Sequence, residues 1–419
     1  MTSPKELDVT HACQVASGDP VRDAFSRLGP VVDFSSVLAA DDPRDLAKCL
    51  AAEQIAHLVE GWRYCAAAFH ASLVNATDNA QHFAYYAELR AAMSLFSGSG
   101  IRVNRHNPFF LDARRQQHSL KKQPTHTIVW AFWPLWAQRA DALDLLKRKI
   151  TLVPGVTIDD VETSLIGLGA SQCLQGWGYD LLQLENDHNA RNIASYEAFW
   201  ATRPLTHMEQ GELNLLSDLW TLLLPEDGAR LRFDIELICY LVRRALSTLK
   251  LSRSNHDPED GETAGSPTEM LTHEDADLQQ IVSAVAAQTG ANEGHLMRVL
   301  TSGSIVTPFT RAEEKSSEVA NMLCRAVFLL RLATLSVNER LPQPGSAAKS
   351  WIANWLEYAG LGDKESDVEF ADFSEDWRLA LEDFSPQAPL PLTLWNEQNA
   401  RRSTLLSRPD ACLAWGVLA

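Results

Sequence analysis

The chain has 419 residues and a formal net charge of −17; 46% of its residues are hydrophobic and 22% are charged. This composition is that of a folded globular protein, and it excludes a collagen-like or intrinsically disordered chain. The charge is uneven, because residues 251–419 carry −12 and residues 1–250 carry −5. The second half would repel a phosphate backbone, so any nucleic-acid contact is expected in the first.

The first half of the chain is predicted to be helical after an irregular lead-in over residues 1–42, where Gly and Pro give turn signals. A long, mostly apolar helix is expected from 44 to 73. The segment His82–Phe96 carries apolar side chains every three or four residues, and Gly98 and Gly100 end it. These elements begin a predicted helical domain over residues 43–251. Its further helical patterns lie near 139–150, 157–166, 170–184, 208–224 and 230–250.

The second half is predicted to be a separate helical domain. Residues 252–275 are acidic, rich in Pro, Gly and Ser and poor in apolar residues, which indicates a linker or an exposed loop. The domain itself covers residues 276–419 and ends in an acidic patch, over 363–383, and an extended, proline-containing tail. Its helices are expected near 276–289, 311–335 and 346–359. A chain of this length favours two domains, so the predicted fold class is all-α, with two helical domains joined by the acidic segment.

The cysteines and the chain start indicate a cytoplasmic protein. The seven cysteines are scattered and form no CxxC pair, which predicts neither a disulfide framework nor a zinc site. The N-terminus lacks a basic region followed by an apolar run, so no signal peptide is expected. The longest apolar run, 128–137, is about half of what a membrane span needs. We expect a soluble protein with no membrane contact, no metal and no cofactor.

A cationic segment follows the predicted helix at 82–96. One interpretation is that it binds the phosphates of nucleic acid, with Phe109 and Phe110 as stacking surfaces. The candidate binding residues are Arg102, Arg105, Arg114, Arg115, Lys121 and Lys122. The alternative is a solvated loop that neutralises acidic groups of a partner or of the chain's own second half. The tryptophan-rich stretch 127–136 comes next and is interpreted mainly as core.

The familiar catalytic motifs GxxxxGK[ST], HExxH and GxSxG are absent. The segment from Arg191-Asn192 to Ser195-Tyr196, preceded by His82–Phe96 and followed by a helix around 238–249, resembles HEPN-related helical proteins of the YaaC-like branch. The resemblance covers residues 45–250. HEPN ribonucleases carry an Arg-x4–6-His motif, in which the Arg steadies phosphate charge and the His carries a proton. Here Tyr196 stands in place of the His, and a tyrosine with a pKa near 10 is a poor general base at neutral pH.

A second stretch, from Arg63 to His70, has the spacing of that motif. A match of this kind arises by chance in a chain with this many Arg and His residues. Both residues are interpreted as members of a core helix.

The resemblance implies a bacterial accessory protein of a phage-defence or toxin-type system that binds a protein partner. In this interpretation the acidic second half and exposed aromatic side chains make the contacts. The alternative is a metal-independent endoribonuclease with Arg191, Asn192 and Tyr196 as catalytic residues. It would bind RNA through the N-terminal half, and a homo-oligomer could complete its site across a two-fold axis. A third hypothesis is a small-molecule binding module built on residues 127–136.

Overall fold

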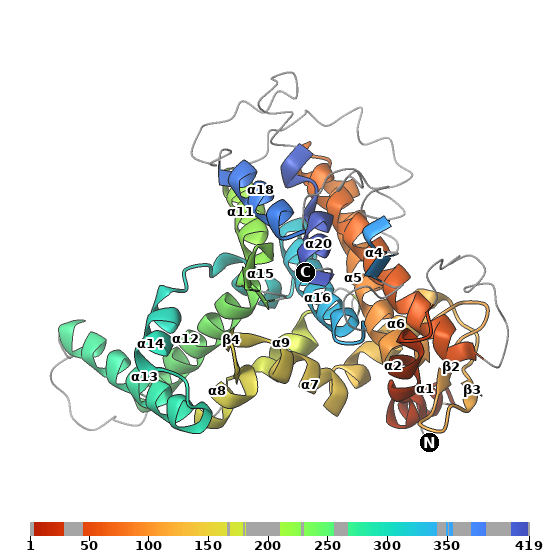
Figure 1. Cartoon of the computed structure of the whole chain (residues 1–419), viewed down its shortest axis with the longest axis horizontal. Helices are drawn as coiled ribbons and strands as arrows, with labels where there is room; N and C mark the ends of the chain where they lie inside the picture. Colours follow the sequence, from red (N-terminus) through yellow and green to blue (C-terminus); the bar gives the residue numbers. More distant parts are fainter. Residues whose placement is uncertain are drawn as a thin grey trace.

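The computed structural model (Figure 1) describes residues 4–28, 45–165, 168–178, 181, 210–227, 230–254, 267–341, 349–350, 352–354, 370–382 and 404–417. Helices dominate these ranges, and the strands are few and short. The prediction of a mainly helical fold is therefore confirmed.

Two long helices that follow one another in sequence lie side by side (Figure 1). They are α4 (Leu46–Leu73) and α5 (Thr77–Gly98). Both are rich in Ala, a strong helix former, and both bury apolar side chains. Gly100 follows α5 with φ +84°, a conformation that glycine adopts without strain. Both helices and the glycine stop were correctly predicted by the sequence.

A third helix, α16 (Val319–Asn338), comes from the second half of the chain and packs against both. Two hydrogen bonds join α16 to α4. Trp62 Nε1 donates to Thr334 Oγ1 at 3.1 Å, and Gln54 Nε2 donates to Ser336 Oγ at 3.0 Å. Of the described helices, α16 alone is long and apolar enough to cross a membrane, but most of it is buried inside the protein. Its composition is explained by its place in the core.

The other helices surround these three. The predicted helix at 311–335 divides into α15 and α16, because Arg325 donates to the carbonyls of Glu314 and Ser316 in the connection between them (2.8 and 2.7 Å). Trp133 and Trp136 of α6 are buried, as predicted. The bounds are α6 (Thr125–Trp136), α7 (Ala140–Lys149), α8 (Ile158–Ser164), α9 (Ala170–Gly176), α11 (Gln210–Leu223), α12 (Arg232–Ser254), α13 (Pro267–Thr289), α14 (Glu293–Ser302), α15 (Thr307–Glu313), α18 (Phe370–Glu382), the 3₁₀ helix η3 (Pro409–Ala411) and α20 (Cys412–Val417).

The two halves of the chain share one cluster of buried hydrophobic side chains. Buried ion pairs also join them. Arg325 of α16 lies 3.6 Å from Glu88 of α5, and Arg331 of α16 lies 2.6 Å from Asp234 of α12. The division into two domains remains a prediction.

Helices also occupy segments that the sequence predicts to be irregular. α1 (Pro4–Val15) and α2 (Asp19–Phe25) lie in the expected lead-in, 1–42. The Gly18-Asp-Pro20 signal starts a helix here, because Pro20 falls in the first turn, where its missing N–H costs nothing. In the predicted linker, α12 continues to Ser254 and α13 begins at Pro267.

The cationic segment is built around a small sheet. β1 (Ile101–Arg102), β2 (Phe109–Leu111) and β3 (Gln117–Ser119) pair antiparallel in that order. Such strands are too short for a period-two pattern to appear in the sequence. Two further hairpins are β4 (Thr151–Val153) with β5 (Val156–Thr157), and β6 (Pro225–Asp227) with β7 (Arg230–Leu231).

Candidate functional site

The structure separates the candidate binding residues by environment. Arg102 is buried and forms an ion pair with Glu53 of α4, with 2.7 Å between Nη2 and Oε1. Its guanidinium also lies 5.6 Å from the centre of the Phe109 ring. A buried arginine held by a buried carboxylate is a structural group, because removing either partner leaves the other charge buried. Arg102 is therefore not an exposed phosphate contact, contrary to the prediction.

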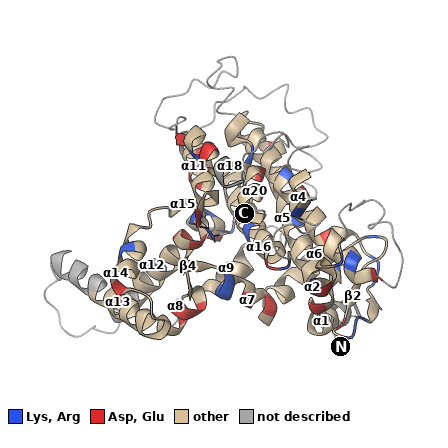
Figure 2. Cartoon of the chain, viewed as in Figure 1, with Lys and Arg blue, Asp and Glu red and all other residues tan. Residues whose placement is uncertain are grey.

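The other candidates are exposed, and we call them the cationic surface: Arg105, Arg114, Arg115, Lys121 and Lys122. Basic residues appear in blue beside β2 in Figure 2. Arg115 pairs with Asp23 of α2 at 2.8 Å. No acid within the described ranges pairs with Arg105, Arg114 or Lys122. The described acids that pair with arginines of the cationic segment therefore belong to the first half of the chain. Much of the positive charge of this segment faces solvent.

The predicted stacking surfaces are absent from this region. Phe109 and Phe110 are 0% and 2% exposed. Phe110 packs edge-on against His11 of α1 and stacks on His118 of β3 at 4.8 Å between ring centres. Both phenylalanines are core residues, because the sheet is covered on both faces at β2.

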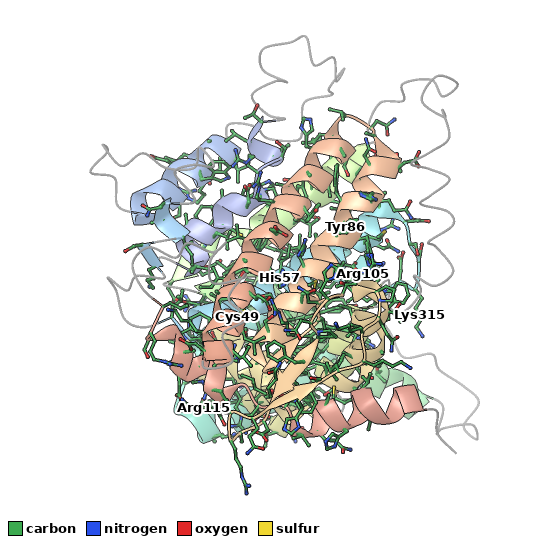
Figure 3. The ribbon with its side chains drawn as sticks, turned by 90° about the vertical axis from the view of Figure 1, so that its right-hand side faces the viewer. Cys49, His57, Tyr86, Arg105, Arg115 and Lys315 are labelled. Carbon is green, nitrogen blue, oxygen red and sulfur yellow. The ribbon has the colours of Figure 1, made fainter. Side chains whose placement is uncertain are left out.

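A cavity of about 480 Å³ lies beside the cationic surface, between α4, α5, the β1–β2 connection and the start of α6. This volume is within the range of small-molecule sites. We call it the basic cavity, because its three arginines outnumber its two carboxylates. In Figure 3, His57, Tyr86 and Arg105 lie on the face turned toward the viewer. The lining residues are Glu53, Ala56, His57, Glu60, Tyr86, Leu89, Arg90, Met93, Arg102, Val103, Asn104, Arg105, His106, Thr125 and His126.

One wall of the basic cavity is a network centred on Arg90 of α5. Its Nη2 lies 2.8 Å from Glu60 Oε2, and its Nη1 lies 3.1 Å from His57 Nδ1. Arginine only donates, so His57 Nδ1 accepts, and the other ring nitrogen of the neutral imidazole carries the hydrogen. Burial, together with the charges of Arg90 and Arg102, lowers the pKa of His57 to about 3. His57 is therefore a neutral hydrogen-bond donor at physiological pH.

An aromatic group lies next to this network, because Tyr86 is one turn before Arg90 on α5. Tyr86 of α5 stacks on Tyr64 of α4 at 5.2 Å between ring centres. His126 of α6 lies 2.8 Å from the Tyr85 hydroxyl through its Nδ1 and packs edge-on to Tyr86. The cavity thus combines cationic donors with flat, partly apolar rings.

The proposed catalytic residues Arg191, Asn192 and Tyr196 lie outside the described residues. Arg63 and His70 lie on α4, a core helix as the sequence analysis expects, and both side chains are exposed on it.

The described side chains offer little other chemistry. All seven cysteines lie in the described residues, are buried and form no disulfide. Burial raises the pKa of the Cys13 and Cys173 thiols to about 12, which keeps them protonated and unreactive. In the described part of the chain, no cluster of His, Cys, Asp and Glu is arranged for a metal. The exposed large hydrophobic side chains there are Val306 and Leu379, so the expected exposed aromatic contacts are not found.

Sequence reasoning missed most of the basic cavity. It singled out Arg102 and Arg105 but not the α4 and α5 residues. A usable signal was present, because Glu53, His57 and Glu60 are spaced four and three residues apart and so share one face of α4. Polar residues on one face of an otherwise apolar helix mark a buried network or a site.

Comparison of the chain with protein-family models, with curated proteins and with solved structures finds no match.

Proposed function

We propose that this chain acts by binding, as an accessory protein whose basic cavity and cationic surface receive an anionic partner. One observation carries the proposal: Arg90 of α5 and Arg105 of the β1–β2 connection line one cavity, beside the buried pair of Arg102 and Glu53. Guanidinium groups recognise phosphate and carboxylate groups through paired hydrogen bonds. The acidic second half disfavours anions elsewhere, which supports this end of the molecule as the contact.

The chemistry of the described residues supports binding over catalysis. Acid–base catalysis needs a group with a pKa near the working pH, and nucleophilic catalysis needs an activated side chain. His57 is neutral with its acceptor nitrogen already occupied by Arg90. Burial raises the pKa of the Cys13 and Cys173 thiols to about 12, so they are not activated nucleophiles.

The resemblance to HEPN-related proteins adds a setting to the proposal: a cytoplasmic bacterial defence or toxin-type system, with a protein as the partner. An acidic segment of such a partner would meet Arg105, Arg114 and Lys122, which no described acid neutralises. This replaces the acidic second half and exposed aromatics as the proposed contact surface.

The alternative function is a metal-independent endoribonuclease that uses Arg191, Asn192 and Tyr196. The exposed bases of the cationic surface favour it, because RNA binding rests largely on contacts with phosphates.

Fluorescence anisotropy tests the binding proposal with two labelled probes, a single-stranded RNA and a glutamate-rich peptide. We expect wild-type protein to bind one of them, and Arg105→Glu with Arg114→Glu to weaken that binding by about tenfold or more. Arg298→Glu on α14, an exposed arginine away from this surface, is the matched control and should bind like wild type. If neither probe binds, or if the control weakens binding equally, the proposal is wrong.

The two functions separate in a cleavage assay. Labelled RNA is incubated with wild-type protein and with Arg191→Ala in EDTA. Cleavage that disappears in the variant establishes the ribonuclease. No cleavage at high protein concentration leaves binding as the function.

A further inference from the structure

The basic cavity has features that neither a flat protein contact nor a simple phosphate patch requires. It is a concave space of about 480 Å³ rather than an open surface. Its lining combines arginine donors with the ring of Tyr86, one turn before Arg90 on α5, and the ring of His126, which packs edge-on to Tyr86. A ligand that fills it therefore needs an anionic end and a flat, partly apolar end.

The donors in the cavity are suited to phosphoryl oxygens. Arg105 has no acidic partner among the described residues and stands at the rim. Arg90 is held in place by Glu60 and His57, so its guanidinium is already oriented. The neutral imidazole of His57 adds an N–H donor. Fixed donors reduce the ordering cost of binding.

The N-terminal end of α6 also lines the cavity. Thr125 and His126, the first two residues of the helix, both line the space. The first N–H groups of a helix lack intrahelical partners and carry the positive end of its dipole. The positive end of the helix dipole therefore adds to the attraction of the cavity for an anionic ligand.

The rings of Tyr86 and His126 would favour a phosphate that carries a nucleobase over inorganic phosphate. Tyr86 and His126 are only partly buried, whereas Trp62, Phe69 and Phe96 of α4 and α5 are core. A nucleobase stacks on rings of this kind, and such stacking tolerates any base.

We propose that the basic cavity binds a nucleoside phosphate, with its phosphate at Arg90 and Arg105 and its base against Tyr86 and His126. This inference rests on the proposed function, because it names the chemistry that the cavity recognises in an anionic ligand. The same chemistry is found in a free nucleotide and in the 5′-terminal nucleotide of an RNA strand.

Isothermal titration calorimetry of the full chain tests the inference. The probes are the four ribonucleoside 5′-monophosphates, adenosine and inorganic phosphate. We expect at least one monophosphate to bind with one site per chain, and about tenfold or more tighter than adenosine or inorganic phosphate. Equal affinity for inorganic phosphate would overturn the role of the rings.

Variants locate the site. Arg105→Ala should weaken nucleotide binding by about tenfold or more, and Tyr86→Leu should weaken it without affecting inorganic phosphate. Arg298→Ala on α14, an exposed arginine outside the cavity lining and the cationic surface, is the control and should leave the affinity unchanged. Thermal unfolding of each variant checks that it is folded. Equal losses in Arg105→Ala and Arg298→Ala would contradict the site.

Two RNAs that differ only in a 5′ phosphate or a 5′ hydroxyl distinguish the sources. A preference for the phosphorylated end identifies an RNA terminus, and equal affinity with tight mononucleotide binding identifies a free nucleotide. Failure of the inference is separable from failure of the proposed function. If no mononucleotide binds while Arg105→Glu with Arg114→Glu still loses RNA or peptide, only the nucleotide site is wrong.

Discussion

Arg331 of α16 and Asp234 of α12 form an ion pair of 2.6 Å in which both side chains are 1% exposed. Two atoms of the guanidinium donate to the carboxylate, at 3.1 and 2.6 Å. The pair joins helices that are separated by almost one hundred residues of sequence. It shows that the core helix of the second half is held to the first half by polar as well as apolar contacts.

Removing one member of this pair should cost much stability. Asp234→Ala leaves the Arg331 charge buried without its carboxylate, and we expect the free energy of unfolding to fall by about 3–5 kcal/mol. Urea denaturation followed by tryptophan fluorescence measures it. Glu375→Ala, which breaks an exposed pair with Arg378 on α18, is the matched control and should leave the midpoint unchanged. Equal effects of the two substitutions would contradict the argument.

The close crossing of the central helices depends on Gly61 in α4. A Cβ atom there would lie 2.7 Å from Leu330 of α16 and 3.3 Å from Arg90 of α5. We expect Gly61→Ala to destabilise the protein by about 1–3 kcal/mol despite the higher helix propensity of Ala. Gly211→Ala in α11 meets open space and should stabilise slightly or have no effect. A higher melting temperature for Gly61→Ala than for Gly211→Ala would show that the helices do not pack as described.

Arg102 and Arg105 line the same cavity but should respond differently to substitution. Arg102→Ala leaves Glu53 buried without its partner, so we expect a loss of about 3 kcal/mol or more in the free energy of unfolding. Arg105→Ala removes an exposed side chain and should leave stability unchanged while weakening ligand binding. Denaturation curves of the two variants check this difference. Equal stability would mean that Arg102 is not structural.

His57 makes stability depend on pH. Its pKa is lowered from 6.5 to about 3 by burial and by Arg90 and Arg102, so the unfolded chain binds the proton more readily than the folded chain. The contribution of the neutral ring is therefore complete above about pH 6.5 and is lost as pH falls toward 3. Between pH 6.5 and 3, the free energy of unfolding should fall less steeply with decreasing pH in His57→Gln than in wild type. The two slopes should differ by up to about 1.4 kcal/mol per pH unit. Urea denaturation at several pH values measures both slopes. If wild type and His57→Gln show the same pH dependence, His57 does not have the lowered pKa.

The sequence by itself determined where the main helices lie. The helices over 46–73 and 77–98 are set by local signals: apolar residues at helical spacing, many alanines and a glycine stop. The buried tryptophans of α6 and the mainly helical class follow from the same kind of information. Such signals lie within a few turns of chain, so they can be seen without knowing what packs against what.

Only the tertiary structure decided the environment of the polar residues. Arg102 and Arg105 are three positions apart, yet one is paired in the core and the other is free at a rim, because Glu53 reaches only the first. The basic cavity likewise combines residues from α4, α5, the β1–β2 connection and α6. Burial, pKa and charge pairing depend on neighbours that are distant in sequence, and the spacing of residues along one chain does not specify those neighbours.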